Sequence, residues 1–287
     1  MFKQRHIVIT GGSSGLGLAL AGRLLDEGAR VTLVARQRAR LESAQRSLIA
    51  ARPSAVVEIE ALDVTDAAAT RSGMDAIAAR TEGIDGLINC AGILREGYFE
   101  TLTDNDFREV MEVNYFGPLN ATRAALPHLV AGSNNDTSTG APTAWLINIA
   151  SVAGLTGVFG YTPYCASKHA LVGLTESLYY ELSPRGIRVQ LACPGEFDSP
   201  MVDQLEQGRT PENRAQTLSI PKASVDAIAD DIMAGLAQGD FLIVPTRKAR
   251  LATLGMRLLP SLSRKLMRRT VERVYQGPDD SLQRQIG

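Results

Sequence analysis

Four polar residues of the 287-residue chain have the types and spacing needed to move a proton to a carbonyl oxygen. Tyr164 and Lys168 lie four residues apart in a predicted helix, so their side chains share one helix face. A phenol donates a proton poorly at neutral pH unless a cation stabilises the phenolate, as the Lys168 ammonium would. Ser151 ends a predicted strand and can hydrogen-bond an oxygen that gains negative charge. Asn114, in the middle of another predicted helix, can support a water-mediated proton route.

The Tyr-x-x-x-Lys spacing is not specific by itself, because it also occurs by chance on solvent-exposed helices. Two neighbouring residues are less suitable for the same role. Tyr161 is seven residues from Lys168, and Ser167 falls on another face of the helix. The interpretation therefore depends on the elements that position the pair.

Short β-branched apolar runs alternate with helical patterns along the chain. Nearly continuous apolar strands must be covered by helices on both faces, which predicts a parallel sheet. The expected fold class is α/β, a doubly wound parallel sheet (Rossmann fold) in three α/β/α layers. The polar segment 132–143 is predicted to be a solvated loop. Strands are predicted at 6–10, 31–35, 56–63, 86–92, 144–151, 187–195 and 241–245, and helices at 18–28, 39–51, 66–81, 103–129 and 163–183.

A glycine-rich turn, TGGSSGLG (10–17), joins the first predicted strand to the first predicted helix. A pyrophosphate can approach the backbone N–H groups of such a turn because no side chains collide with it and the helix dipole favours negative charge. The alternative is a purely structural glycine turn. The strand before and the helix after favour a dinucleotide site, with Gly11, Ser13, Ser14, Gly15, Leu16 and Gly17 against the cofactor.

The residue that ends the second predicted strand is Arg36. A site selective for NAD places Asp or Glu there to accept from the ribose 2′-hydroxyl, whereas Arg accommodates a 2′-phosphate. Arg40 lies one helical turn further on. The two residues predict NADPH as the cofactor, against the alternative of a solvated basic helix start.

Composition and charge narrow the class of protein. Residues 1–245 hold 20 Lys/Arg against 28 Asp/Glu, so the main body is not expected to bind nucleic acid. Three cysteines in apolar stretches indicate reduced thiols and a cytoplasmic location. No signal peptide or transmembrane segment is predicted. The three histidines are scattered, so no metal site is expected.

Taken together, the motifs resemble those of the short-chain dehydrogenase/reductase family. Four of them match in order over residues 6–245: TGGSSGLG, NCAG (89–92), Ser151 with YCASK (164–168), and PGEFDSP (194–200). The sequence departs from the family at Cys90, where a second Asn is common, and at Ser199, where Thr is usual.

The resemblance implies a role for each matching residue. Ser151 would polarise the carbonyl, Tyr164 would donate the proton, Lys168 would hold the ribose and tune Tyr164, and Asn114 would serve as the relay. Further cofactor contacts are implied for Asp63 and Val64 near the adenine, for Asn89 in support of the cofactor strand, and for Ala91, Gly92, Pro194, Gly195, Phe197 and Ser199.

Within the family, LVAR (33–36), INCAG (88–92) and the stretch from 198 to 218 are similar to those of 3-ketodihydrosphingosine reductases. That resemblance implies NADPH-dependent reduction of a lipid-like ketone, the 3-ketone of a long-chain base, in sphingolipid biosynthesis. A 3-oxoacyl-thioester or steroid-type ketone reductase is the alternative within the class. A non-catalytic NADP-binding regulatory protein is the alternative outside it.

The C-terminal segment differs from the rest of the chain. Residues 246–276 hold nine Lys/Arg against one Asp/Glu, and their apolar residues recur at helical spacing with an interruption at Pro260. We expect a catalytic domain over 1–245 and a basic, amphipathic, helical extension over 246–287. The extension could contact an anionic membrane peripherally, or pack on the body or on a partner subunit. A homo-oligomer, a dimer or tetramer, is expected from the family resemblance.

Overall fold

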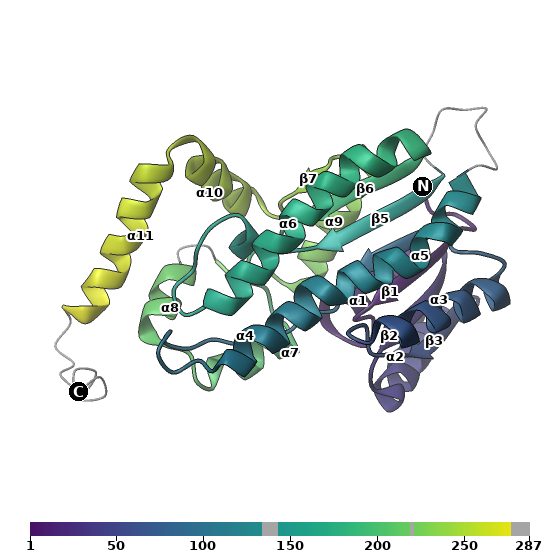
Figure 1. The fold of residues 1–287 in the computed structure, drawn as a ribbon, viewed down its shortest axis with the longest axis horizontal. Coiled ribbons are helices and arrows are strands. Elements are labelled where there is room, and N and C mark those ends of the chain that lie inside the picture. The colour runs from purple at the N-terminus through teal and green to yellow at the C-terminus, as the bar shows by residue number, and fades with distance from the viewer. Residues whose placement is uncertain (134–142, 219–220, 277–287) are drawn as a thin grey trace.

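The computed structural model describes residues 1–133, 143–218 and 221–276, so most of the predicted loop at 132–143 lies outside the described residues. Seven parallel strands form one sheet in the order β3-β2-β1-β4-β5-β6-β7 (Figure 1). This confirms the predicted doubly wound sheet. The strands are β1 His6–Thr10, β2 Arg30–Ala35, β3 Val57–Ala61, β4 Gly86–Asn89, β5 Ala144–Ile149, β6 Ile187–Ala192 and β7 Leu242–Ile243.

Two apolar cores lie on opposite faces of the sheet because successive strand residues point to alternate sides. In β1, Ile7 and Ile9 pack into one core and Val8 into the other. The first core is completed by α1 (Gly15–Asp26), α2 (Arg38–Ala51) and α9 (Val225–Gln238). The second is completed by α3 (Ala67–Thr81), α5 (Gly117–Ser133) and α6 (Thr162–Leu182). Figure 1 shows α5 and α6 in front of the sheet.

The strand order reverses between β1 and β4, because the chain runs outward from β1 through β2 to β3 and then returns to β4. Crossover connections on the two sides of this point diverge, which leaves a crevice at the carboxyl ends of the strands. The loops that follow β1, β2, β4, β5 and β6 all begin at this edge.

The predicted helix at 103–129 is interrupted. It consists of α4 (Asp104–Met111), a π-helical turn at Glu112–Phe116, and α5. Thr103 and Asp106 start α4 with a reciprocal capping box. Three helices were not among the sequence predictions: α7 (Pro200–Glu206), α8 (Pro211–Thr217) and α9. Each begins after a Ser or Thr whose hydroxyl accepts a hydrogen bond from a first-turn N–H group.

Two helices follow the last strand, as the basic C-terminal pattern predicts: α10 (Arg247–Leu258) and α11 (Pro260–Tyr275). We call residues 247–275 the arm. It leaves the body at Thr246, whose φ of 65° is unusual for a β-branched residue and whose N–H donates to Asp231 at 2.7 Å. The arm lies at one end of the molecule, with α11 packed against α8 (Figure 1). No helix in the described part of the chain is both long and apolar enough to span a bilayer.

Candidate active site

A cavity of about 400 Å³ runs along the carboxyl edge of the sheet and collects the motifs that are far apart in the sequence. Asn89 and Asn114 are the two predicted site residues that do not line it. The other predicted residues do: Gly11, Ser13, Ser14, Gly15, Leu16, Gly17, Arg36, Arg40, Asp63, Val64, Ala91, Gly92, Ser151, Tyr164, Lys168, Pro194, Gly195, Phe197 and Ser199.

The turn between β1 and α1 is built so that only glycine fits at its critical positions. Gly11 has a φ of 69°, and a Cβ there would lie 2.7 Å from the Ala91 nitrogen. A Cβ on Gly17 would lie 2.4 Å from the Gly11 carbonyl oxygen. Gly15, with a φ of 53°, has no other atom within 3.9 Å of where its Cβ would be. The turn therefore packs tightly against the protein at Gly11 and Gly17 and leaves open space at Gly15.

The N-terminus of α1 faces this space, and no side chain in the described part of the chain caps it. Ser14, the N-cap residue, makes no side-chain hydrogen bond to the helix, and the first turn contains no acidic residue. A helix start of this kind has free N–H donors and a positive dipole end. The residues present therefore fit a dinucleotide pyrophosphate.

Arg36 and Arg40 line the end of the cavity near β2, and both are exposed. Among the described residues neither has an ion-pair partner, whereas the intervening Arg38 pairs with Glu42 at 3.1 Å. Asp63 lies close by and is engaged locally, since its carboxylate accepts from the Thr65 N–H and hydroxyl at 3.0 and 2.8 Å. Two cations without carboxylate partners thus face the cavity at this end.

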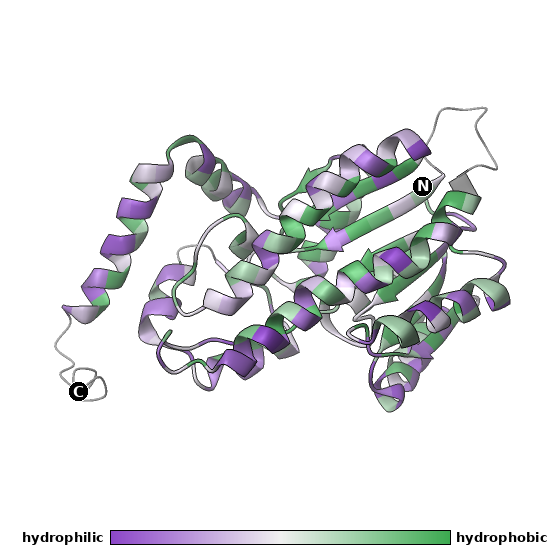
Figure 2. Ribbon diagram, in the orientation of Figure 1, coloured by the Kyte–Doolittle hydropathy of each residue, from purple (hydrophilic) through white to green (hydrophobic). Residues whose placement is uncertain are grey.

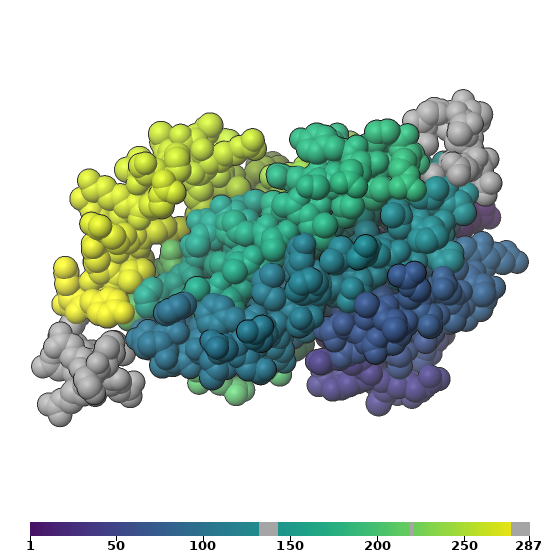
Figure 3. Space-filling view, in the orientation of Figure 1, coloured from purple at the N-terminus to yellow at the C-terminus, as the bar shows by residue number. Residues whose placement is uncertain are grey.

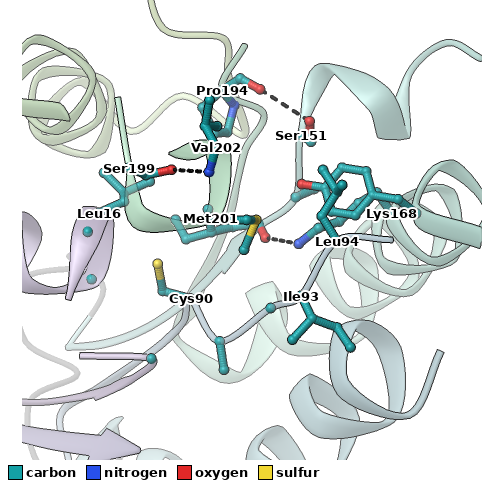
Figure 4. A pocket seen from close by; sticks show the side chains of 18 of the residues that line it. Leu16, Cys90, Ile93, Leu94, Ser151, Lys168, Pro194, Ser199, Met201 and Val202 are labelled. Carbon is teal, nitrogen blue, oxygen red and sulfur yellow. Dashed lines mark hydrogen bonds between the residues drawn. The ribbon is translucent and has the colours of Figure 1, made fainter. Parts of the chain in front are cut away.

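At the other end, Tyr164 and Lys168 of α6 meet Ser151. Ser151 does not end the strand as predicted: β5 stops at Ile149, and Ser151 caps the short 3-10 turn Val152–Gly154 that follows. Lys168 Nζ donates to the Ile149 carbonyl oxygen at 3.0 Å and lies 5.6 Å from the centre of the Tyr164 ring. The Ser151 hydroxyl donates to the Pro194 carbonyl oxygen at 3.4 Å, accepts from the Ala153 N–H at 3.1 Å, and lies close enough to the Tyr164 hydroxyl to affect its pKa. Figure 4 shows Ser151 and Lys168 on the same side of the cavity. A carbonyl-bearing ligand could therefore meet both hydroxyls at one point.

Burial controls the acidity of this group more strongly than charge does. Removal from water raises the pKa of Tyr164 to about 12, and the hydrogen bond from Ser151 opposes this only in part. Removal from water also lowers the pKa of Lys168 to about 8. For Tyr164 this direction is opposite to the one expected from the neighbouring ammonium, because the loss of water is the largest effect on its pKa. Nζ lies over the ring and is hydrogen-bonded to the Ile149 carbonyl oxygen.

Asn114 and Asn89 act one layer behind the cavity wall. Asn114 is fully buried in the π-helical turn, where it accepts from the Ile93 N–H at 2.8 Å and donates to the Ile93 carbonyl oxygen and to Ser167. Its amide thus anchors the loop after β4 beside Lys168. Asn89 donates to Thr122 and to Asn148 at 3.1 and 2.9 Å, which ties β4 to α5 and β5. Ser167 points away from the cavity, as expected.

The substrate end of the cavity contains residues that the sequence did not point to. Tyr161, set aside above, lines it and stacks edge-on with Tyr164 at 5.6 Å. Met256 and Met267 reach it from the arm. Their positions depend on long-range packing that no local motif records. Several further apolar side chains line this end: Leu94, Val113, Val158, Met201 and Val202.

A buried ionic network holds the segment that follows β6. The Arg209 side chain is fully buried and donates to both oxygens of Glu196, at 3.0 and 2.6 Å, and also to Glu206 and Thr217. Glu196 directly follows Pro194 and Gly195. A bidentate pair of this kind fixes orientation as well as distance. It therefore ties α7 and α8 to the loop beside Ser151.

Comparisons with known proteins agree with this geometry. Two relatives are a 3-ketodihydrosphingosine reductase of Dictyostelium discoideum, 32% identical over 88% of this chain and 79% of that protein, and a 3-dehydrosphinganine reductase of Danio rerio, 31% identical over 82% and 69%. A short-chain dehydrogenase/reductase from Burkholderia phymatum in complex with NAD superposes with a TM-score of 0.75 at 27% identity, covering 90% of this chain and 95% of that one. A short-chain dehydrogenase from Burkholderia cenocepacia in complex with NADP gives 0.73 at 26%, covering 87% and 99%.

The solved neighbours thus bind NAD or NADP in the same fold. The family model for short chain dehydrogenases matches residues 5–210, which include the glycine turn, Ser151, Tyr164, Lys168 and the PGEFDSP loop. The chain belongs to the short-chain dehydrogenase family of oxidoreductases.

Proposed function

We propose that this protein uses NADPH to reduce a long-chain keto amine, most specifically 3-ketodihydrosphingosine to dihydrosphingosine. The observation that carries the proposal is the continuity of the cavity. It runs from Arg36 and Arg40, past Ser151, Tyr164 and Lys168, to an apolar end that includes Met256 and Met267. Similarity to 3-ketodihydrosphingosine reductases over most of the chain supports the substrate class.

The proposed chemistry assigns one task to each polar residue at the reacting end. The bound nicotinamide would supply a hydride to the carbonyl carbon. The Ser151 hydroxyl donates a hydrogen bond to the carbonyl oxygen, and the Tyr164 hydroxyl delivers a proton to it. Burial keeps the phenol protonated near neutral pH, so Tyr164 enters the reaction as an acid.

Lys168 would hold the cofactor ribose and stabilise the phenolate that remains after proton transfer. A buried ammonium is costly in the absence of an anion, so Lys168 favours the state in which Tyr164 is ionised. Asn114 would hold the Ile93 backbone at the proton-relay position, since its amide oxygen accepts from the Ile93 N–H and its amide nitrogen donates to the Ile93 carbonyl oxygen.

NADPH is proposed over NADH because of Arg36 and Arg40. Both line the cavity, both are cationic, and neither is neutralised by a carboxylate among the described residues. A 2′-phosphate would satisfy both guanidinium groups, whereas a free ribose 2′-hydroxyl would not. Asp63, which lies nearby, is occupied by Thr65.

The test is NADPH consumption with three ketones side by side: a long-chain 3-keto amine, a 3-oxoacyl thioester and a steroid ketone. The proposal expects the keto amine to have the highest kcat/KM. Preference for the thioester or the steroid would move the assignment to the alternative reductase. Binding of NADPH without turnover of any ketone would favour the regulatory protein.

Three further expectations remain predictions. We propose a cytoplasmic location, supported by three free cysteines, a homo-oligomeric assembly, and peripheral contact with a membrane through residues 246–276. The division into domains at 245 and 246 is likewise proposed, supported by the change of charge there and by the separate course of the arm.

A further inference from the structure

The inner face of the arm lines the substrate end of the cavity. Ala249 at its base is buried, and Met256 and Met267, one from each helix, line the cavity wall. At the tip, α11 packs against α8, and the Tyr275 hydroxyl lies near the fully buried Glu212 of α8, which accepts from Tyr98 at 3.2 Å. The arm is therefore attached to the body at both ends, with the cavity between them.

The outer face of the same two helices has no apolar partner among the residues that the structure describes. Leu251, Leu254 and Leu258 recur at three and four residues and so form one stripe on α10. Met256 is two residues from both Leu254 and Leu258, which places it about 200° around the helix, on the opposite side. The arm leucines are at least half exposed: Leu251 70%, Leu254 50%, Leu258 66%, Leu259 57%, Leu262 50% and Leu266 53%.

Cations accompany these leucines. The arm carries nine Lys/Arg and one acidic residue, Glu272. Within the residues that the structure describes, the arm's single ion pair is Arg268–Glu272 at 3.0 Å. Figure 2 shows hydrophilic and hydrophobic residues interspersed along both helices. The outer face therefore combines exposed apolar area with a large uncompensated positive charge.

This combination selects among possible occupants. Pairing of two arms would bring two strongly positive segments together. Elsewhere in the described chain, the large exposed apolar side chains lie on several elements, and one small group forms where Tyr179 and Tyr180 lie beside Phe241. An anionic bilayer supplies both an apolar layer for leucines and phosphates for the cations.

We propose that the arm docks the protein on an anionic lipid surface, so that a long-chain ketone passes between that surface and the cavity along the arm's inner face. The passage rests on the proposed substrate class, whereas the docking does not. Figure 3 shows the arm standing at one end of the molecule with an opening between it and the body. The same two helices carry the outer face, which would meet the lipid, and the inner face, which lines the cavity. Docking therefore brings the substrate end of the cavity to the membrane.

The test uses the full chain with NADPH bound and vesicles of equal parts phosphatidylglycerol and phosphatidylcholine, with pure phosphatidylcholine vesicles for comparison. The variant is Leu254→Ser/Leu258→Ser. The matched control is Ile49→Ser/Val56→Ser, which removes two exposed aliphatic side chains at the other end of the molecule. Cosedimentation gives binding. Two rates are measured, one for a long-chain keto amine dissolved in the vesicles and one for a short, water-soluble ketone.

Wild type and control should bind the anionic vesicles and release them at high salt, while the leucine variant binds at least about tenfold more weakly. Its rate on vesicle-dissolved ketone should fall in parallel, with the rate on the soluble ketone unchanged. Equal vesicle binding by the variant overturns the docking. The docking is also overturned if the wild type binds no vesicles but forms a stable dimer that the leucine variant does not form.

Weak vesicle binding together with an undiminished rate on vesicle-dissolved ketone overturns the passage. Failure of the proposed function has a separate signature, because it shows as no reduction of the long-chain keto amine in detergent micelles, where no vesicle is present. In that case cosedimentation alone decides the docking.

Discussion

The buried ammonium of Lys168 should make the cofactor-free protein less stable than a variant that lacks it. Lys168 is 4% exposed, and burial lowers its pKa from 10.5 to about 8. At pH 7 the lysine is protonated in the folded and the unfolded chain, so the folded state carries the full desolvation cost. Lys168→Met keeps an unbranched side chain that is one atom shorter, and it removes the charge.

The size of the effect follows from these two pKa values. A difference of 10.5 against about 8 corresponds to about 3 kcal/mol at pH 7. The substitution also removes the hydrogen bond to the Ile149 carbonyl oxygen, which costs about 1 kcal/mol. We therefore expect the free energy of unfolding of Lys168→Met to exceed that of wild type by about 2 kcal/mol, although turnover is lost.

The pH dependence distinguishes this cause from better packing. Since the folded pKa of Lys168 lies below the unfolded one, the unfolded chain binds more protons between pH 8 and 10.5. Wild-type stability gains from this group as pH rises through that window, so the advantage of the variant should shrink across it and not return. Urea unfolding from pH 7 to 10, followed by the fluorescence of the single tryptophan, Trp145, measures the difference.

The exposed Lys3 provides the matched control, because Lys3→Met removes a charge that is already hydrated. Its difference from wild type should be small and independent of pH. A lower stability of Lys168→Met at pH 7, or an advantage that stays constant up to pH 10, would refute the reasoning from desolvation.

Three other substitutions test separate parts of the site. Tyr164→Phe should lower kcat at least about a hundredfold with the Kd for NADPH nearly unchanged, since it removes only the proton donor; steady-state rates and cofactor fluorescence check this, and retained turnover would exclude Tyr164 as the acid. Arg36→Asp should weaken NADPH binding about tenfold or more and shift the preference toward NADH, so an unaltered ratio of the two kcat/KM values would contradict the phosphate contact. Gly17→Ala should raise the Kd for NADPH at least about tenfold, because its Cβ would lie 2.4 Å from the Gly11 carbonyl oxygen and force the turn to move. Gly22→Ala in the same helix is the control, since its Cβ would meet only the flexible end of Arg52, at 3.2 Å; equal binding by both variants would show that the close approach is unimportant.

Local signals explain why much of the fold was predictable. Continuous apolar runs, such as residues 144–149, must be buried on both faces, and their alternation with helices leaves few arrangements besides a parallel sheet. The boundaries at the strand ends were less predictable. For example, 187–195 was expected to be one strand, but β6 ends at Ala192 because Pro194 and Gly195 leave the sheet for the cavity. The break in the helix at Glu112–Phe116 also carries no local sign, since a π-helical turn depends on what Asn114 bonds to.

The site divides in the same way. Gly11, Gly17, Ser151 and Lys168 could be placed together because parallel strands bring their carboxyl ends to one edge, so the sequence alone determined which residue types meet there. The tertiary structure decided how those residues behave. It buries Lys168 and partly buries Tyr164, and at both side chains the loss of water outweighs the attraction of opposite charge. It also brings Met256 and Met267 to the cavity from nearly a hundred residues further along the chain. Both results depend on packing between distant segments, and packing is a property of the assembled molecule rather than of any one stretch of residues.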